Sequence, residues 1–170
     1  MAARASEDPP AMGCPYLKRK GVAAHGLRFM PGGAALVPMR DAAGRLWSVQ
    51  RLLAAKLRDG RTGEAGTDKL YGPPKASPDE EVPSRKLGLF HVIGDAEAAA
   101  GVLLLAEGYA TGATLHEATG RPVAVAFDAG NLVHVARELR GLHPALALLV
   151  CGDDDRDTEA RSGKNPGRLK

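Results

Sequence analysis

The sequence predicts an α/β protein: a parallel sheet with flanking helices, preceded by a small basic α+β subdomain that contains a β-hairpin. Two patterns support this fold class. From residue 101 onward, short apolar runs alternate with stretches of helical spacing, which is typical of parallel strands joined by crossover helices. Before that point, apolar runs flank a short turn instead, as in a pair of antiparallel strands.

The C-terminal part is expected to contain three strands and two helices. Three short apolar runs bounded by Gly or Pro predict the strands, which we expect to lie buried in a sheet: 102–106, 122–127 and 145–151. A helix over 111–119 is expected to end at Gly120. Asn131 is expected to cap a second helix, because the apolar residues that follow recur at helical spacing.

The hairpin is expected where two apolar runs, 35–39 and 46–49, flank the segment 41–44. This segment has Asp at the first turn position and Gly at the fourth. Pro38 donates no backbone hydrogen bond, so its strand is expected at an edge or at a bulge. Trp47 is expected to anchor the core.

Weaker local signals predict four further elements: a helical turn over 14–22 that stops at Gly21, strands over 69–71 and 87–93, and a helix over 96–100 capped by Asp95. We divide the chain accordingly into a disordered leader, a basic α+β subdomain with a mobile loop, and a C-terminal α/β domain: 1–13, 14–94 with its loop 56–86, and 95–170.

The composition excludes several classes of protein. The 170 residues are 44% hydrophobic, as in ordinary globular proteins. No apolar run approaches the roughly 18 residues of a membrane span, and the N-terminus lacks the apolar stretch of a signal peptide. Cys14 and Cys151 form no C-x-x-C pair, which excludes a zinc ribbon within this chain. We expect a cytoplasmic protein without a membrane partner.

Charge is distributed unevenly along the chain. Residues 1–90 hold 15 Lys and Arg against 9 Asp and Glu, whereas residues 91–170 hold 8 against 11. A basic half beside an acidic half is suited to a protein that holds a polyanion near a metal site.

Acidic residues follow each predicted strand of the C-terminal part. Glu107 follows the first and Asp128 the second, and four carboxylates follow the third: Asp153, Asp154, Asp155 and Asp157. The carboxyl ends of parallel strands meet at one edge of a sheet. In extended backbone, residues two apart point to the same side, so Asp153 and Asp155 form a facing pair.

Like charges this close repel one another unless a cation joins them, and hard divalent ions take oxygen ligands. The pattern therefore predicts that Glu107, Asp153 and Asp155 share one or two divalent cations. A solvated acidic loop without a ligand is the alternative. An EF-hand is excluded, because Thr158 and Lys164 stand where its loop needs Gly and Glu.

These motifs resemble the Toprim domain, which bacterial-type DNA primases share with topoisomerases and certain nucleases. The similarity lies in 105–111, which reads LAEGYAT, and in 150–155, which reads VCGDDD. The Glu-Gly-Tyr form is most similar to primases. The start at 16–21, the hairpin and the strand at 90–94 are similar to the primases of plasmids and mobile elements. The resemblance covers roughly residues 15–165.

The resemblance implies a role for each matching residue. Glu107 would be a metal ligand or the general acid/base at the reacting 3′-hydroxyl. Asp153 and Asp155 would hold the Mg²⁺ or Mn²⁺ ions that bind the incoming triphosphate, with Asp157 as an outer helper. Nucleotide contacts are implied for the turn and for the second strand end: Gly108, Asp128 and Asn131. Toprim domains normally continue with a further strand and helix, so a C-terminally short domain is expected here.

The implied function is a DNA primase catalytic core, a nucleotidyltransferase of DNA replication that makes short RNA primers from NTPs on single-stranded DNA. A replicative helicase is a candidate partner. Basic residues of the N-terminal part would guide template and triphosphates: Lys18, Arg19, Lys20, Arg51, Lys69, Arg85 and Lys86. Two alternatives stay open: a Toprim nuclease or topoisomerase-like module, and a non-catalytic nucleic-acid-binding fragment of a primase–helicase.

Overall fold

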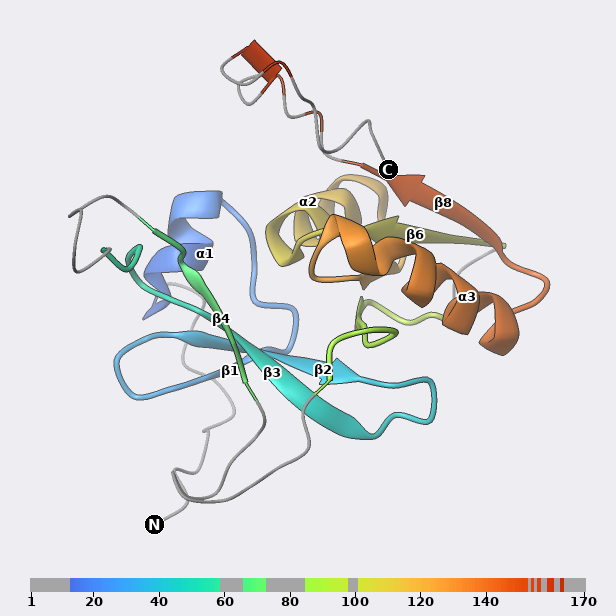
Figure 1. The fold of residues 1–170 in the computed structure, drawn as a ribbon, viewed down its shortest axis with the longest axis horizontal. Helices are drawn as coiled ribbons and strands as arrows, with labels where there is room; N and C mark the ends of the chain where they lie inside the picture. The colour runs from blue at the N-terminus through green and yellow to red at the C-terminus, as the bar shows by residue number, and fades with distance from the viewer. Residues whose placement is uncertain are drawn as a thin grey trace.

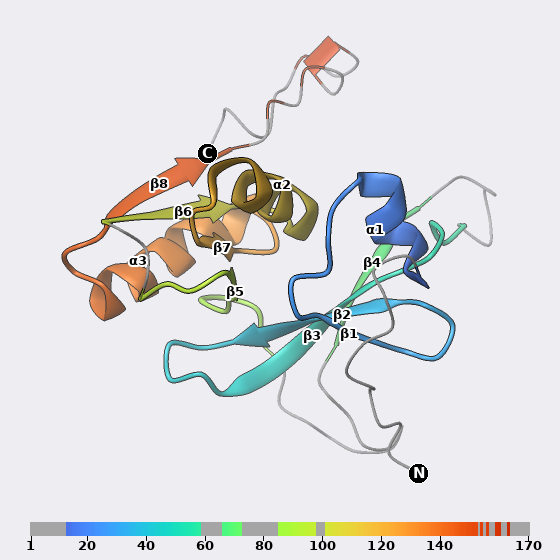
Figure 2. The same cartoon turned by 180° about the vertical axis from the view of Figure 1, so that it is seen from behind.

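The computed structural model describes residues 13–58, 66–72, 85–97 and 101–152, together with 154, 156, 159, 160 and 163. These residues form two four-stranded sheets, with strand orders β1-β2-β3-β4 and β5-β7-β6-β8. Figure 1 shows the first sheet near helix α1 and the second sheet beside helices α2 and α3, and Figure 2 shows the same arrangement from behind. The predicted α/β class is confirmed at this level.

The first sheet is antiparallel throughout and is built on the predicted hairpin. The hairpin joins β2 (Ala35–Arg40) to β3 (Leu46–Leu52), and β1 (Arg28–Phe29) and β4 (Lys69–Gly72) extend it on either side. In the turn, the Asp41 carboxylate accepts hydrogen bonds from the backbone N–H groups of Ala43 and Arg45, at 3.0 and 2.9 Å. This local bonding is why Asp at the first turn position was informative.

Among the described residues, no strand pairs with β2 beside Pro38 on the β1 side. The two residues of β1 pair only with the start of β2, while Arg40 at its end forms an isolated bridge with Phe90. The missing N–H of Pro38 therefore costs no ladder hydrogen bond. The register of the β2–β3 pair shifts directly after Met39. The prediction that the strand of Pro38 lies at an edge or at a bulge is confirmed.

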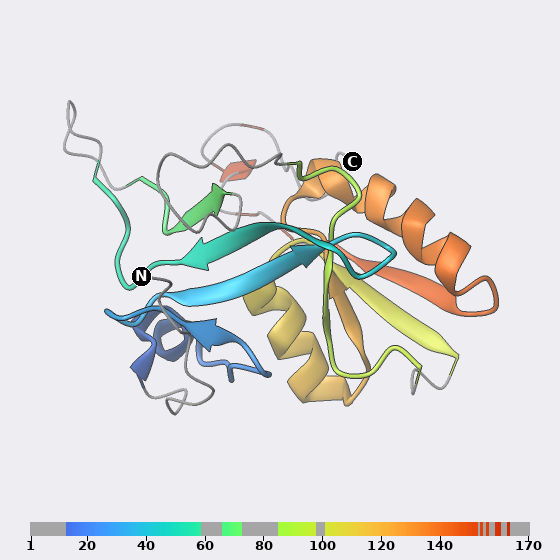
Figure 3. The same cartoon turned by 90° about the horizontal axis from the view of Figure 1, so that it is seen from below.

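Strand alternation gives the first sheet a buried inner face and a half-buried outer face. On β2, Ala35, Val37 and Met39 have no exposed surface, whereas Leu36 and Pro38 between them are only partly buried. The view from below in Figure 3 shows β2 and β3 crossing the front of the molecule, with none of the described helices over them.

The inner face contributes to a core shared with the second sheet. Helix α1 (Pro15–Lys20) ends at Gly21, whose φ of 67° is left-handed, and this confirms the predicted helical turn. Side chains from both sheets and from α2 form one buried cluster, which includes Leu17, Val37, Met39, Ile93, Tyr109, Val125 and Phe127. The two sheets are therefore joined by packed apolar side chains.

Trp47 lies at the rim of this core and is only partly buried. Its indole N–H donates to the Asp41 carboxylate at 2.7 Å. The guanidinium carbons of Arg45 and Arg85 lie 4.3 and 4.6 Å from the ring centroid. Trp47, which was predicted to anchor the core, is thus a half-buried ring that two arginine side chains cover.

The second sheet is mixed, which corrects the prediction of a parallel sheet. Strands β6 (Val102–Ala106), β7 (Val123–Val125) and β8 (Ala147–Cys151) are parallel as predicted, but β5 (His91–Ile93) pairs with β7 in the antiparallel sense. The strand predicted over 87–93 is shorter, because its first residues form a turn. A three-residue strand takes its partner from tertiary packing, and an alternating pattern does not specify that partner.

Helices α2 (Tyr109–Thr119) and α3 (Leu132–Leu142) contribute to different apolar clusters around this sheet. Gly120 ends α2 in a left-handed conformation, as predicted. Asn131 stands at the predicted N-cap position of α3, but its side chain makes no cap hydrogen bond there. Asp128 supplies the cap instead: its carboxylate accepts from the Asn131 N–H at 3.0 Å and begins a single 3₁₀ turn, η2 (Ala129–Asn131), before α3.

Strand β8 lies at the edge of the sheet, where β6 is its partner among the described strands. Leu149 and Val150 are 56% and 53% exposed, so the prediction of a buried strand is wrong for these residues. An apolar run shows that a strand can be buried, but strand order decides whether it is.

Other predictions fall wholly or partly outside the described residues. These are the leader 1–13 apart from Gly13, much of the loop 56–86, and residues 98–100 of the helix expected at 96–100. The described part of that helix is a turn in which Asp95 accepts from the Glu97 N–H at 2.9 Å. The boundary expected at residue 94 stays a prediction, although β5 lies before it and pairs with β7. No described helix is long and apolar enough to cross a membrane.

His91 on β5 predicts a pH-dependent stability. Burial, assisted by the positive charge of Arg40, lowers the pKa of His91 from 6.5 to about 4. Below about pH 6.5 the unfolded chain therefore binds a proton at His91 that the folded chain does not bind. The stability that depends on a neutral His91 is complete above about pH 6.5 and is lost as the pH falls toward 4. The loss amounts to about 3 kcal/mol.

Urea unfolding between pH 7 and pH 4 checks this expectation. The stability of a His91→Gln variant should fall less steeply with acid, whereas a His134→Gln variant on α3 should follow the wild type. An unchanged acid slope in the His91 variant would assign the loss to other groups.

Candidate functional site

The ends of the parallel strands define one edge of the second sheet. Ala106, the last residue of β6, is in register with Cys151, the last residue of β8, and with Val125 at the end of β7. Glu107 follows β6 directly, and Asp128 follows β7 by three residues. The structure therefore brings these two carboxylates to the same edge. Gly152 leaves β8 at the same level.

The aspartates that follow Gly152 cannot be placed at this edge. Asp153, Asp155 and Asp157 lie outside the described residues. Asp154 is described; it is exposed and bonds the Arg156 guanidinium at 2.6 Å. Within the described part of the chain, no three His, Cys, Asp or Glu side chains gather as metal ligands would. The predicted metal site therefore stays a prediction, with Glu107 as its described member.

Gly108 begins α2 immediately after Glu107 and leaves room for a lysine from the other sheet. The Lys69 ammonium lies 3.5 Å from the position that a Cβ on Gly108 would take. Lys69 belongs to β4 and faces inward, in the row of Leu52. The start of α2 also carries the partial positive charge of a helix N-terminus. Two sources of positive charge therefore lie at Gly108, the residue that follows Glu107.

Tyr71 connects the first sheet to the end of β7. Its hydroxyl accepts from the Gln50 amide at 2.8 Å and donates to the Phe127 carbonyl at 3.0 Å. Burial raises the pKa of Tyr71 above its ordinary value, so the hydroxyl remains a donor. The Lys86 ammonium lies 5.5 Å from the Tyr71 ring centroid. Side chains of both sheets thus meet at this edge.

Phe127 turns the chain between β7 and Asp128. Its φ of 74° is in the left-handed region, which a bulky residue rarely occupies and which costs about 1–3 kcal/mol. The Tyr71 hydroxyl bonds the carbonyl of this same residue. Beyond the turn, one Asp128 oxygen caps η2 and the other forms an ion pair with Lys86. The Tyr71 hydrogen bond and the Lys86 ion pair thus hold this strained turn at the place where the two sheets meet.

Asn131 ties the segment before β5 to the end of β7. It is fully buried, and its amide N–H groups donate to the carbonyls of Leu89 and Ala126, at 3.0 and 2.8 Å. Its amide oxygen accepts from the Gly88 N–H at 2.8 Å. These bonds use the whole amide, so the residue positions the segment that carries Lys86. A nucleotide contact by Asn131 stays a prediction.

Comparison with known proteins agrees with the resemblance in the motifs. No family model matches the sequence, and no solved structure does. Two proteins of Escherichia coli, both called DNA primase TraC, are 39% and 36% identical to the chain over 160 residues, or 92% of its length. This similarity confirms the predicted resemblance to plasmid-type DNA primases. It spans 13% and 10% of the lengths of these two relatives.

The basic residues expected to serve a primase separate into three groups. Lys69 and Lys86 lie at the strand-end edge, beside Gly108 and Asp128. Arg19 and Arg85 are engaged by carboxylates, with Asp68 at 3.0 Å and Asp41 at 3.4 Å. The rest lie away from this edge, on α1 or on the outer face of the first sheet: Lys18, Lys20 and Arg51.

Sequence reasoning missed Gln50 and Tyr71, a hydrogen-bonded pair of the first sheet whose tyrosine donates to the Phe127 carbonyl after β7. A signal for Gln50 was present, because strand alternation puts a polar amide at a core-facing position between Ser48 and Leu52. A buried amide needs a polar partner. The identity of that partner, Tyr71, depends on the register of β3 with β4, where Gln50 stands opposite Tyr71.

Proposed function

We propose that the chain carries the catalytic core of a DNA primase, which joins ribonucleotides into short RNA primers on single-stranded DNA. The observation that carries this proposal is the similarity to two proteins called DNA primase over 92% of the chain. The strand-end edge supports it, because Lys86 pairs there with Asp128 and Lys69 reaches Gly108 from the first sheet. Such a site suits an anionic substrate held by acidic groups through cations.

Mg²⁺ or Mn²⁺ is part of the proposal. Glu107, Asp153 and Asp155 would hold the ions, with Asp157 further out. The donor set fits, since carboxylate oxygens are what these hard ions prefer. The register of β6 with β8 also fits, because Glu107 and Gly152 leave neighbouring strands side by side. When bound, such ions neutralise the charge of a triphosphate and of the oxygen that leaves it.

The lysines of the edge have separate tasks in this proposal. Lys69 stands over the start of α2, so together they present positive charge to the phosphates of an incoming NTP. Lys86 is paired with Asp128, which orients its ammonium toward the turn at Phe127. Glu107 either holds an ion or accepts the proton of the attacking 3′-hydroxyl. Single-stranded DNA is the template, and a replicative helicase is a candidate partner.

Primer synthesis on single-stranded DNA with NTPs and Mg²⁺ or Mn²⁺ tests the proposal. We expect short RNA products from the wild type and none from an Asp153→Ala, Asp155→Ala variant. An Asp95→Asn, Glu97→Gln variant is the matched control, since it removes the same charge from the turn before β6. Product that persists in the double-alanine variant contradicts the metal site. Cleavage of plasmid DNA without primer synthesis identifies a Toprim nuclease, and DNA binding without either reaction identifies a non-catalytic module.

A further inference from the structure

The outer face of the first sheet carries positive charge on an apolar floor. The four strands contain four basic residues and no acidic one: Arg28, Arg40, Arg51 and Lys69. Lys69 points inward, whereas the three arginines share the outer face. Arg28 stands opposite Leu36, Leu36 opposite Arg51, and Arg51 opposite Leu70, so these residues form one row across the sheet.

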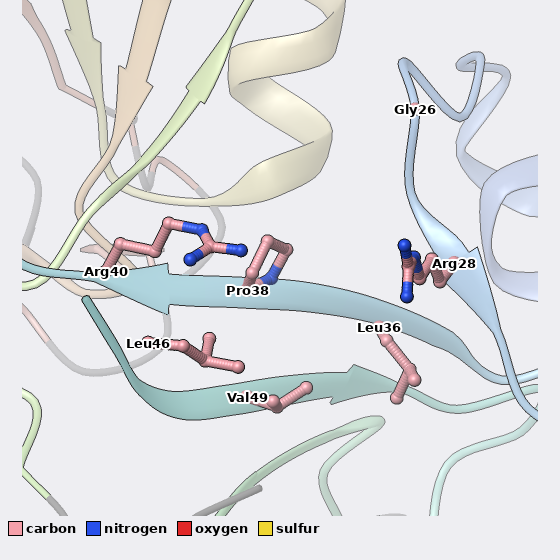
Figure 4. A pocket seen from close by; sticks show the side chains of 7 residues that line it. All are labelled: Gly26, Arg28, Leu36, Pro38, Arg40, Leu46 and Val49. Atoms are coloured by element: carbon pink, nitrogen blue, oxygen red, sulfur yellow. The ribbon is translucent and has the colours of Figure 1, made fainter. Parts of the chain in front are cut away.

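The same face is hollowed into a shallow pocket of about 390 Å³. Figure 4 shows Leu36 and Pro38 on β2 and Leu46 and Val49 on β3, with Arg28 and Arg40 toward opposite ends. None of these apolar side chains is fully buried. An apolar floor with cationic ends differs from an ordinary solvated strand face, where polar side chains alternate with the buried ones.

Two of the three guanidinium groups are available to a ligand. Arg28 is exposed and Arg51 half-buried, and among the described residues neither has an ion-pair or hydrogen-bond partner for its side chain. Arg40 donates one N–H to the Gly44 carbonyl at 2.8 Å, which fixes it at the hairpin end. Arg28 and Arg51 lie two strand spacings apart, about 10 Å.

We propose that this outer face is a second nucleic-acid surface, which holds a single strand outside the strand-end edge. The charge selects a polyanion, because the arginines are not balanced by carboxylates in the strands. The apolar floor selects a single strand, since unpaired bases can lie against Leu36, Pro38 and Val49 while duplex bases are covered. The inference rests on the proposed function, from which the nucleic-acid substrate comes.

The sheet separates this face from the candidate catalytic edge. Lys69 and Tyr71 point to the inner side of the sheet, toward Gly108 and Phe127 respectively. Leu70 lies between them on β4 and points outward, as does Arg51, its partner on β3. A strand held on the outer face therefore gains affinity without touching the reacting groups. Loss of the arginines on the outer face should weaken the binding of nucleic acid and leave the rate of primer synthesis at saturating DNA unchanged.

Binding of fluorescent single strands at several salt concentrations tests the inference with an Arg28→Gln, Arg51→Gln variant. The slope of log Kd against log salt should fall by about 0.7 for each lost phosphate contact, so by about 1.4 in total. An Arg121→Gln, Arg137→Gln variant removes the same charge elsewhere and should keep the wild-type slope. Oligo-dT and oligo-U probes distinguish a template strand from an RNA product.

The outcomes separate this inference from the proposed function. If the wild type binds no single strand, the proposed function itself fails. If the wild type binds a single strand and both variants keep its affinity and salt slope, the inference is wrong but the proposed function is not contradicted. This face would then serve another partner, such as an acidic protein. A duplex probe that loses as much affinity as the single strand would overturn the role given to the apolar floor.

Discussion

In the proposed primase reaction, replacing Glu107 by Gln is expected to lower the rate of primer synthesis about a hundredfold or more. Glutamine keeps the shape of the side chain at the end of β6, but it carries no negative charge and accepts no proton at neutral pH. Whether Glu107 holds a cation or takes the proton of the 3′-hydroxyl, either task needs the carboxylate. Steady-state primer synthesis with saturating NTPs and template measures the loss.

The comparison needs a matched substitution and a folding check. Glu97→Gln removes the same charge from an exposed position before β6 and should leave the rate within about twofold of the wild type. Thermal unfolding of both variants shows whether the sheet edge is intact. A rate for Glu107→Gln close to that of Glu97→Gln would remove Glu107 from the catalytic set and leave the aspartates after β8 to act without it.

Charge at the candidate site comes from both halves of the chain. Glu107 and Asp128 end strands of the second sheet, whereas Lys69 comes from β4 and Lys86 from the segment that leads into β5. The basic and acidic halves of the sequence are thus parts of one site. The apolar core that both sheets share fixes the distance between them.

The sequence predicted those features that depend on neighbours along the chain. The hairpin follows from Asp41 and Gly44, because a turn is made by local hydrogen bonds. The ends of α1 and α2 follow from Gly21 and Gly120, which adopt left-handed backbone conformations with little strain. Apolar runs bounded by Gly or Pro predicted strands over 102–106 and 145–151, and the structure has parallel strands at 102–106 and 147–151.

Features that depend on distant partners escaped the prediction. Asp128 and Asn131 are both good capping residues, and their chemistry alone does not show which one caps and which one is buried. The structure resolves this, because Leu89 and Ala126 offer carbonyls to the Asn131 amide only once β5 lies beside β7. Lys69 reaches Gly108 only once the two sheets pack together, so a sequence pattern could name the lysine but not its position.

Asn131→Ala is expected to lower the free energy of unfolding by about 4 kcal/mol. The substitution removes an amide that donates to Leu89 and Ala126 and accepts from Gly88, and it leaves these backbone groups without a partner. Each buried group left unsatisfied costs about 1–3 kcal/mol, and the full burial of Asn131 gives water little access to replace the amide. Urea unfolding at pH 7 measures the change.

Thr119→Ala provides the comparison, because Thr119 also bonds the backbone through its side chain but is exposed. Its hydroxyl donates to the Leu115 carbonyl at 2.6 Å and accepts from the Arg121 N–H at 3.2 Å. Water can replace these bonds, so we expect a cost below about 1 kcal/mol. If Asn131→Ala cost no more than this, solvent would reach the end of β7, and the segment that carries Lys86 would depend on other contacts for its position.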